Sequence, residues 1–275
     1  MTQEEKLNLL TLWFLKDAGE SVKSSDEVRA LSYAEKWRLF RCLVNIRMPA
    51  PVDKAILDVQ DDYLKTRIEE DGITDGDALP TMNSCGSQIP HSDQMSLWQG
   101  DITRLKVNAI VNAANSQMLG CFVPMHLCID NCIHTYAGVQ LRQACFEQME
   151  MLRKQYGAHY QQPTAIPMIT DAYNLPCQKV IHIVGPIVEN ECTLAHEQKL
   201  AECYRNTLEI CEEHHIQSVA FCCISTGVFR FPETRAAEIA VKTVSDWLSN
   251  HPNTLNRVIF NVFKDKDKRC YEQQF

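Results

Sequence analysis

Hydrophobic positions in the first quarter of the chain recur at intervals of three and four residues, which is typical of amphipathic helices. Ser25 and Asp26 can cap the second of the three helices that this pattern predicts, and Pro49 and Pro51 separate the second from the third. No catalytic or binding motif falls in this part, so we expect residues 1–70 to form a helical extension. The apolar positions are Leu7, Leu10 and Phe14, then Tyr33, Trp37, Phe40 and Val44, then Ile56, Val59 and Tyr63.

The pattern changes after this extension. Residues 71–91 are polar and rich in glycine and proline, which indicates a linker. Residues 92–275 then alternate between β-rich runs, at 96–99, 107–112, 165–169, 180–184, 218–224 and 258–263, and helical patterns, at about 130–155, 196–214 and 233–249. This alternation predicts an α/β domain with helices on both faces of a mixed, largely parallel sheet. Ligand sites in such sheets lie at the carboxyl ends of the strands.

Composition narrows the class of protein. Of the 275 residues 45% are hydrophobic and 23% charged, as in an ordinary globular protein. The formal net charge of −8 argues against broad electrostatic binding to nucleic acid or to an anionic membrane. The apolar run at 7–15 is too short to span a bilayer and lacks the basic start of a signal peptide, so we expect a cytoplasmic protein. The 13 cysteines are an odd number, which favours reduced thiols or metal ligands over disulfides.

Three strand ends carry candidate chemistry. Asp101 follows Gly100 on a strand-end turn, where its carboxylate can accept a hydrogen bond from an exocyclic amine. Asn115 ends a buried strand and offers an amide to ligand hydroxyls. The loop 225–229 precedes a helix, and such loops bind phosphate through backbone N–H groups without needing lysine. Each of the three could also be an ordinary turn.

Taken in order, the motifs resemble those of the ADP-ribose-binding macrodomain family, and most closely its hydrolytic branch. The similarity covers about residues 92–272. The six motifs that carry it are Gln99-Gly100-Asp101-Ile102-Thr103, Ala109-Ile110-Val111-Asn112-Ala113-Ala114-Asn115, Cys132-Ile133-His134-Thr135-Tyr136-Ala137-Gly138, Tyr173-Asn174-Leu175-Pro176, Val180-Ile181-His182-Ile183-Val184-Gly185-Pro186 and Ile224-Ser225-Thr226-Gly227-Val228.

The resemblance implies a three-layer α/β/α fold with a cleft that binds ADP-ribose. By the same resemblance Asp101 would receive the adenine amine, with the backbone of Ile102 beside it. Phe263 would pack near the adenosine end, and Asn115 would orient the distal ribose. The residues that would wrap the diphosphate are Ser225, Thr226, Gly227, Val228 and Phe229.

The chain departs from the hydrolytic branch after the asparagine motif. Most members have a run of glycines there, whereas this chain places Cys121, His126 and Cys128 within eight residues. Three protein ligands with a fourth position open are typical of a catalytic zinc site, so we expect one zinc ion per chain. Chance clustering of cysteines and a structural zinc are the alternatives, and Cys132 or His134 could supply a fourth ligand.

This loop resembles that of the zinc-containing macrodomains of microbes. That subgroup also has an N-terminal helical extension and reverses protein ADP-ribosylation, often beside a sirtuin-type transferase and a lipoate-carrier protein. We therefore expect a zinc-dependent hydrolase that removes mono-ADP-ribose from acidic side chains, with Asn115 and Asp130 as catalytic residues. Asp130 could instead be only the N-cap of the following helix. A non-catalytic ADP-ribose reader and an O-acetyl-ADP-ribose deacetylase are the alternative functions.

Overall fold

The computed structural model describes residues 1–19 and 25–275, and its centre is a six-stranded sheet of order β2-β8-β7-β4-β6-β5. Neighbouring strands are parallel except β5 and β6, which are antiparallel. The strands are β2 (Met95–Gln99), β4 (Ala109–Ala114), β5 (Met168–Asp171), β6 (Lys179–Val184), β7 (Ser218–Phe221) and β8 (Arg257–Val262). The mixed, largely parallel sheet is confirmed, and each β-rich run of the sequence overlaps one of these strands.

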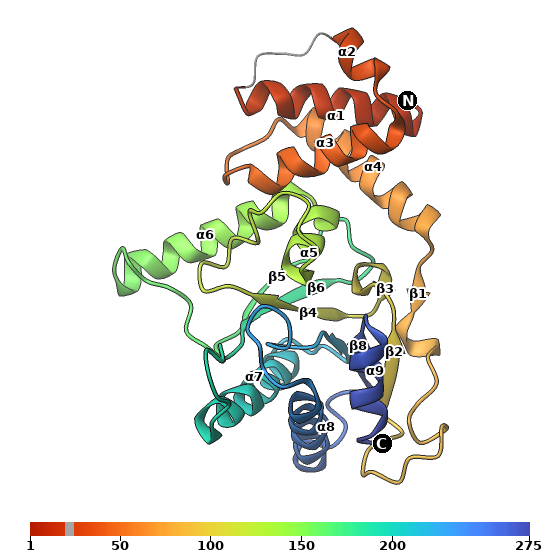
Figure 1. Cartoon of the computed structure of the whole chain (residues 1–275), viewed down its shortest axis with the longest axis vertical. Helices are drawn as coiled ribbons and strands as arrows, with labels where there is room; N and C mark the ends of the chain where they lie inside the picture. Colours follow the sequence, from red (N-terminus) through yellow and green to blue (C-terminus); the bar gives the residue numbers. More distant parts are fainter. Residues whose placement is uncertain (20–24) are drawn as a thin grey trace.

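Helices cover both faces of the sheet and complete three layers (Figure 1). On one face α5 contacts β4 and α6 contacts β5, while on the other α7 contacts β6 and α9 contacts β2 and β8. The central strands are almost continuously buried, as strands covered on both faces must be. The helices are α5 (Ile129–Ala137), α6 (Val139–Tyr156), α7 (Leu194–Glu213), α8 (Glu233–Asn250) and α9 (Asp265–Glu272).

The single helical pattern expected at about 130–155 is two helices, and Gly138 divides them. Gly138 has a φ of 93°, a conformation that ends α5 and that side-chain-bearing residues rarely adopt. A Cβ at this position would also lie 2.6 Å from Gln60 Nε2. From this break α5 and α6 run in different directions, and α5 packs against β4 (Figure 1).

The N-terminal region is helical, as expected. Its helices are α1 (Gln3–Asp17), α2 (Ser25–Ala30), α3 (Tyr33–Ile46) and α4 (Lys54–Asp71). The predicted cap of α3 was wrong: Ser25 and Asp26 belong to the short helix α2, and Ser32 caps α3 in a capping box with Glu35. Ser32 is closer to the apolar repeat, and the glutamate three residues later satisfies a second backbone group.

These helices have their own hydrophobic core, built around Phe14, Phe40 and Tyr63. They lie against α5 and α6, on one side of the sheet domain (Figure 1). The rings of Trp37 on α3 and Tyr136 on α5 have centroids 5.8 Å apart, which joins this core to the domain. At this contact between the two parts Trp37 is buried and Tyr136 is half-buried.

The segment after α4 runs along the edge of the domain. Strand β1 (Thr74–Asp75) pairs in parallel with β3 (Leu105–Lys106), and Arg257 of β8 donates a hydrogen bond of 3.0 Å to the carbonyl of Leu79. All 13 cysteines are free thiols. Within 1–19 and 25–275, no helix combines the length and hydrophobicity needed to cross a membrane.

Candidate active site

Four neighbouring parallel strands end side by side in the order β2, β8, β7, β4. Asp101 follows β2, Phe263 follows β8, the loop 225–229 follows β7, and Asn115 follows β4. Parallel strands present their carboxyl ends at one edge of a sheet, where ligands bind. The residues predicted for adenosine, diphosphate and distal ribose therefore lie along this edge in the order in which those groups are joined.

The adenosine end of this row has a fixed carboxylate and an open aromatic surface. Asp101 Oδ1 accepts hydrogen bonds from Thr103 N at 2.9 Å and from Thr103 Oγ1 at 2.7 Å, which holds the side chain in one orientation. Ile102 is buried behind it, in a 3-10 turn that Asp101 caps. Phe263 is 72% exposed, so that its ring is available to a planar ligand group.

The loop after β7 has an unusual backbone. Ser225 has a φ of 66°, and its buried Oγ has no hydrogen-bond partner among the described residues. Arg230 N closes a turn on the carbonyl of Gly227, and Val228 is largely exposed. Backbone strain and an unsatisfied buried hydroxyl are typical of loops shaped for a ligand.

Asp130 lies at the end of β4 although it belongs to α5. Asn112 Nδ2 donates to Asp130 Oδ1 at 2.8 Å, and Asn115 Nδ2 lies 3.4 Å from Asp130 Oδ2. Asn115 also donates to the carbonyl of Gly120 at 3.1 Å. Burial raises the pKa of Asp130 to about 6, while the hydrogen bond from Asn112 and the charge of Arg142 lower it. The two predicted catalytic residues are therefore in contact.

The alternative reading of Asp130 as a helix cap does not hold. Helix α5 begins at Ile129, and its N-cap is Cys128, whose Sγ accepts a hydrogen bond from Asn131 N at 3.4 Å. Asp130 is instead the second residue of the helix, where a negative charge is favourable. Its carboxylate points at Asn112 on the sheet and not at the backbone of its own first turn.

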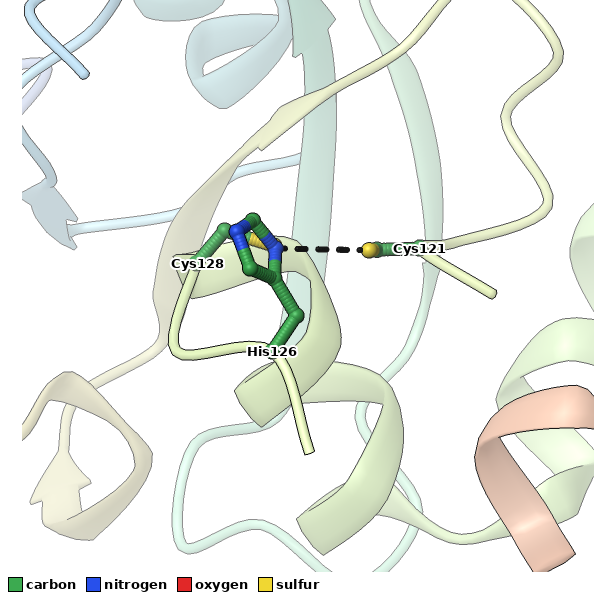
Figure 2. A group of neighbouring side chains, drawn as sticks. All are labelled: Cys121, His126 and Cys128. Atoms are coloured by element: carbon green, nitrogen blue, oxygen red, sulfur yellow. Dashed lines mark hydrogen bonds between the residues drawn. The ribbon is translucent and has the colours of Figure 1, made fainter. Parts of the chain in front are cut away.

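Figure 2 shows the three predicted metal ligands facing one another at the start of α5. The ligand atoms of Cys121, His126 and Cys128 all lie within 4.8 Å of one another, and Cys121 Sγ is 3.5 Å from His126 Nδ1. In a tetrahedral zinc site with Zn–S of about 2.3 Å and Zn–N of about 2.0 Å, sulfur and nitrogen are about 3.5 Å apart. The residues present therefore fit a zinc ion. Cys132 and His134, considered as a fourth ligand, lie outside this group.

A second group of potential ligands, His134, Cys145 and His182, is fully buried in the domain core. His182 already has partners, because Nδ1 lies 3.0 Å from Asn112 Nδ2 and Nε2 lies 3.0 Å from Thr170 Oγ1. Burial lowers the pKa of His182 to about 3 and that of His134 well below its usual value, so both rings are neutral. His134 Nε2 is 3.6 Å from Asp130 Oδ1, beyond hydrogen-bond distance.

Sequence reasoning missed the surroundings of Asp130. Asn112 was visible in the asparagine motif, but its bonds to Asp130 and His182 connect residues far apart in the chain. Arg142 of α6, whose charge acts on Asp130, belongs to no motif and gave no signal.

The chain is similar to known proteins along nearly its whole length. The sequence pattern of the Macro domain family matches residues 111–240. A curated relative from Treponema medium, named protein-ADP-ribose hydrolase, is 42% identical over 277 residues, which covers 99% of this chain and 99% of the relative.

Two solved structures extend the similarity to the fold. The Oceanobacillus iheyensis macrodomain with ADP is 36% identical with a TM-score of 0.57, over 65% of this chain and 87% of that one. The Trypanosoma brucei macrodomain in complex with ADP-ribose is 28% identical with a TM-score of 0.57, over 85% of this chain and 94% of that one.

Proposed function

Since this chain belongs to the macrodomain family, we propose that it is a zinc-dependent hydrolase that removes mono-ADP-ribose from acidic side chains of proteins. The name of the Treponema medium relative supports hydrolysis of protein-linked ADP-ribose. The observation that carries the proposal is the contact between Asp130 and the two asparagines of the β4 end, beside three side chains arranged as metal ligands.

In this proposal ADP-ribose lies along the carboxyl ends of β2, β8, β7 and β4. Asp101 receives the adenine amine beside Ile102, and Phe263 packs on the adenosine end. The backbone of the loop 225–229 wraps the diphosphate, as in other phosphate sites that lack lysine. The distal ribose then lies between Asn115 and the loop that carries the metal ligands, with its anomeric carbon near Asp130.

The chain's own residues position the reaction. Asn115 binds a hydroxyl of the distal ribose, and Asp130 orients a water molecule and takes its proton as that water attacks. Asn112 holds the Asp130 carboxylate at 2.8 Å, so that the base is in place before the substrate arrives.

The metal ligands are Cys121, His126 and Cys128, with one zinc ion per chain. A zinc ion held there would supply Lewis-acid stabilisation of an oxygen or lower the pKa of a bound water. The donor set of two thiols and one imidazole is one that zinc prefers over magnesium or calcium, which bind oxygen ligands.

Acidic side chains fit this site as leaving groups. A carboxylate with a pKa near 4 leaves as a stable anion, whereas an arginine guanidine must be protonated as it leaves because its pKa exceeds 12. Asp130 can accept a proton but the two nearby histidines are buried and neutral, and no general acid is in contact with Asp130 among the described residues. The site is therefore equipped for an ester and not for a guanidine linkage.

The test offers the purified protein three substrates: an aspartyl-ADP-ribosylated protein, an arginine-ADP-ribosylated protein and O-acetyl-ADP-ribose. Each is measured before and after treatment with a chelator and after zinc is returned. A lipoate-carrier protein modified by a sirtuin-type transferase serves as the first candidate for the acidic protein substrate.

Of the two protein substrates, we expect ADP-ribose to be released only from the aspartyl-linked one. This release should stop when a chelator is added and resume when zinc is returned. Release from the arginine substrate overturns the acidic specificity, and full activity in chelator overturns the role of zinc. Turnover of O-acetyl-ADP-ribose alone indicates a small-molecule deacetylase. Retention of ADP-ribose on every substrate, with ADP-ribose still bound, leaves only a reader.

A further inference from the structure

The three predicted metal ligands lie in a segment without regular secondary structure between β4 and α5. We call this segment (residues 120–128) the ligand loop; only its last residue, Cys128, takes part in a helix, as the N-cap of α5 whose carbonyl accepts from Cys132 N at 3.1 Å. A metal site keeps its geometry only when groups outside the ligands fix them. The groups that fix this loop come from two other parts of the chain.

Asn131, in the first turn of α5, binds the loop through three hydrogen bonds. Its Nδ2 donates to the carbonyl of Cys121 at 3.2 Å and to the carbonyl of Val123 at 3.0 Å. Its backbone N–H donates to Cys128 Sγ at 3.4 Å. Asn131 is completely buried; its side chain fixes the backbone at one ligand residue, and its backbone N–H contacts the thiol of another.

Arg41, on α3 of the N-terminal helical region, binds both the loop and Asn131. Its Nη2 donates to the carbonyl of His126 at 2.8 Å and to Asn131 Oδ1 at 2.8 Å, and lies 3.7 Å from Cys132 Sγ. The side chain is buried. The pair Arg41–Asn131 therefore touches all three ligand residues, although Arg41 lies 85 residues before His126 in the chain.

Asn45, one turn further along α3, also forms hydrogen bonds with the ligand loop and with α5. Its Oδ1 accepts from the backbone N of Met125 at 3.0 Å, and its Nδ2 donates to Thr135 Oγ1 of α5 at 2.9 Å. Met125 has a positive φ of 59°, so that this bond stabilises a turn which the backbone alone disfavours. Helix α3 thus holds both the loop and the helix that follows it.

Helix α3 is itself anchored to the domain. Arg142 of α6 donates through Nη1 to the carbonyls of Val44, Asn45 and Arg47 at the end of α3, and through Nε to the carbonyl of Leu119 just before the ligand loop. A buried guanidinium that satisfies the last carbonyls of a helix fixes that helix firmly. Because α3 is fixed in this way, the positions of Arg41 and Asn45 relative to the ligand loop are fixed as well.

We propose that Arg41, acting with Asn131, is a positioning residue that holds Cys121, His126 and Cys128 in metal-binding geometry, so that the N-terminal helical region is part of the metal site. The proposal rests on the zinc site of the proposed function. It gives the N-terminal helical region a role in supporting the metal site. The sequence of that region contains no motif that would indicate such a role.

The test compares the wild type with Arg41→Ala and Arg41→Lys. Asp61→Asn is the matched control, because Asp61 also joins the helical region to the domain but does so away from the loop, through Gln140 Nε2 at 2.7 Å and Asn174 Nδ2 at 2.9 Å. Zinc-loaded proteins are mixed with a chromophoric chelator and zinc release is timed. Hydrogen exchange of the loop amides is measured on the metal-free proteins, and thermal unfolding is recorded for all.

Arg41→Ala is expected to weaken zinc binding by about 10- to 100-fold, as loss of such supporting groups does at other sites, and to release zinc correspondingly faster. Arg41→Lys, which keeps the charge but not the fork of donors, should lie between Arg41→Ala and the wild type. Asp61→Asn should release zinc at the wild-type rate even if its melting temperature falls. In metal-free protein, the amides of 121–128 should exchange faster in Arg41→Ala than in Asp61→Asn.

Wild-type zinc release in both Arg41 variants overturns the proposal. So does equal acceleration in Asp61→Asn, since that would show a general loosening of the fold. If Arg41→Ala does not fold, Arg41→Lys and Asn45→Ala decide by the same two measurements. If the wild type binds no zinc, the zinc role in the proposed function fails, and the hydrogen exchange of the metal-free loop still decides whether Arg41 positions it.

Discussion

Asn112 Nδ2 lies 2.8 Å from Asp130 Oδ1 and 3.0 Å from His182 Nδ1, so that one amide group connects β4, α5 and β6. An amide nitrogen only donates, so His182 Nδ1 accepts and its Nε2 carries the proton toward Thr170 Oγ1 at 3.0 Å. The carboxylate of Asp130 is therefore oriented by a chain of buried hydrogen bonds and not by its own helix.

Replacing this carboxylate should separate catalysis from binding. Asp130→Asn keeps the size of the side chain and an oxygen that can accept from Asn112, but it removes the base. Release of ADP-ribose from the aspartyl substrate should fall by about 10²- to 10⁴-fold, with the affinity for free ADP-ribose nearly unchanged. Asp171→Asn, which only breaks an exposed ion pair with Lys179 at the other edge of the sheet, is the control. Turnover by Asp130→Asn at the wild-type rate would remove Asp130 from the mechanism.

Loss of one metal ligand should remove metal and turnover together. In His126→Ala only two thiols remain, which is too few for a stable protein zinc site. Elemental analysis of the purified variant should show much less than one zinc per chain, and activity should fall in parallel. His159→Ala, which changes an exposed histidine away from the loop, should retain both. A zinc-free His126→Ala protein with full activity would contradict the role of the ion.

The adenine contact can be tested by binding alone. Asp101→Ala removes a carboxylate whose hydrogen bond to an amine is worth about 1.5 to 3 kcal/mol, so the Kd for ADP-ribose in calorimetry should rise by about 10- to 100-fold. Asp75→Ala is a matched control, since Asp75 also caps a 3-10 turn by accepting from the N–H two residues later. Equal affinities in the two variants would show that Asp101 is only a turn residue.

Gly120 should tolerate no side chain at the start of the ligand loop. Its φ is 81°, and a Cβ there would lie 2.8 Å from the ring of His134, which is buried. Gly157 has a φ of 110° but open space around it, so Gly157→Ala isolates the backbone cost of about 1 to 3 kcal/mol. Gly120→Ala should lose about 1 to 3 kcal/mol more in the free energy of unfolding, from overpacking. Denaturant titration of both variants measures the difference, and equal losses would contradict the steric argument.

The buried histidine predicts how stability depends on pH. The pKa of His182 is lowered by burial from 6.5 to about 3, so between these values the unfolded chain binds a proton that the folded chain does not. The contribution of neutral His182 to the free energy of unfolding is complete above pH 6.5. It decreases by about 1.4 kcal/mol per pH unit as the pH falls toward 3. His182→Gln should therefore lose stability at neutral pH but have a flatter profile than the wild type between pH 6 and 4. Parallel profiles, measured on metal-free proteins by denaturant unfolding, would show that His182 titrates normally.

Much of the fold follows from local patterns. Short β-rich runs located all six strands of the sheet, because strands that are covered on both faces need nearly continuous apolar residues. The hydrophobic pattern did not locate the break at Gly138, since the apolar repeat continues through that residue and only its backbone angle separates α5 from α6. It also chose the wrong cap for α3, because several residues near its start can cap a helix and only the folded chain selects Ser32.

The sequence alone determined the strand and helix order and the likeness of the strand-end motifs to a known family, because these depend on residues close together in the chain. It also grouped Cys121, His126 and Cys128, since a loop of eight residues can bring its own side chains together. Tertiary structure alone decided what surrounds them. Asn112 meets Asp130 and Arg41 meets His126 only because packing brings separate elements into contact, and hydrogen bonds between residues 18 and 85 positions apart leave no periodic trace in a sequence.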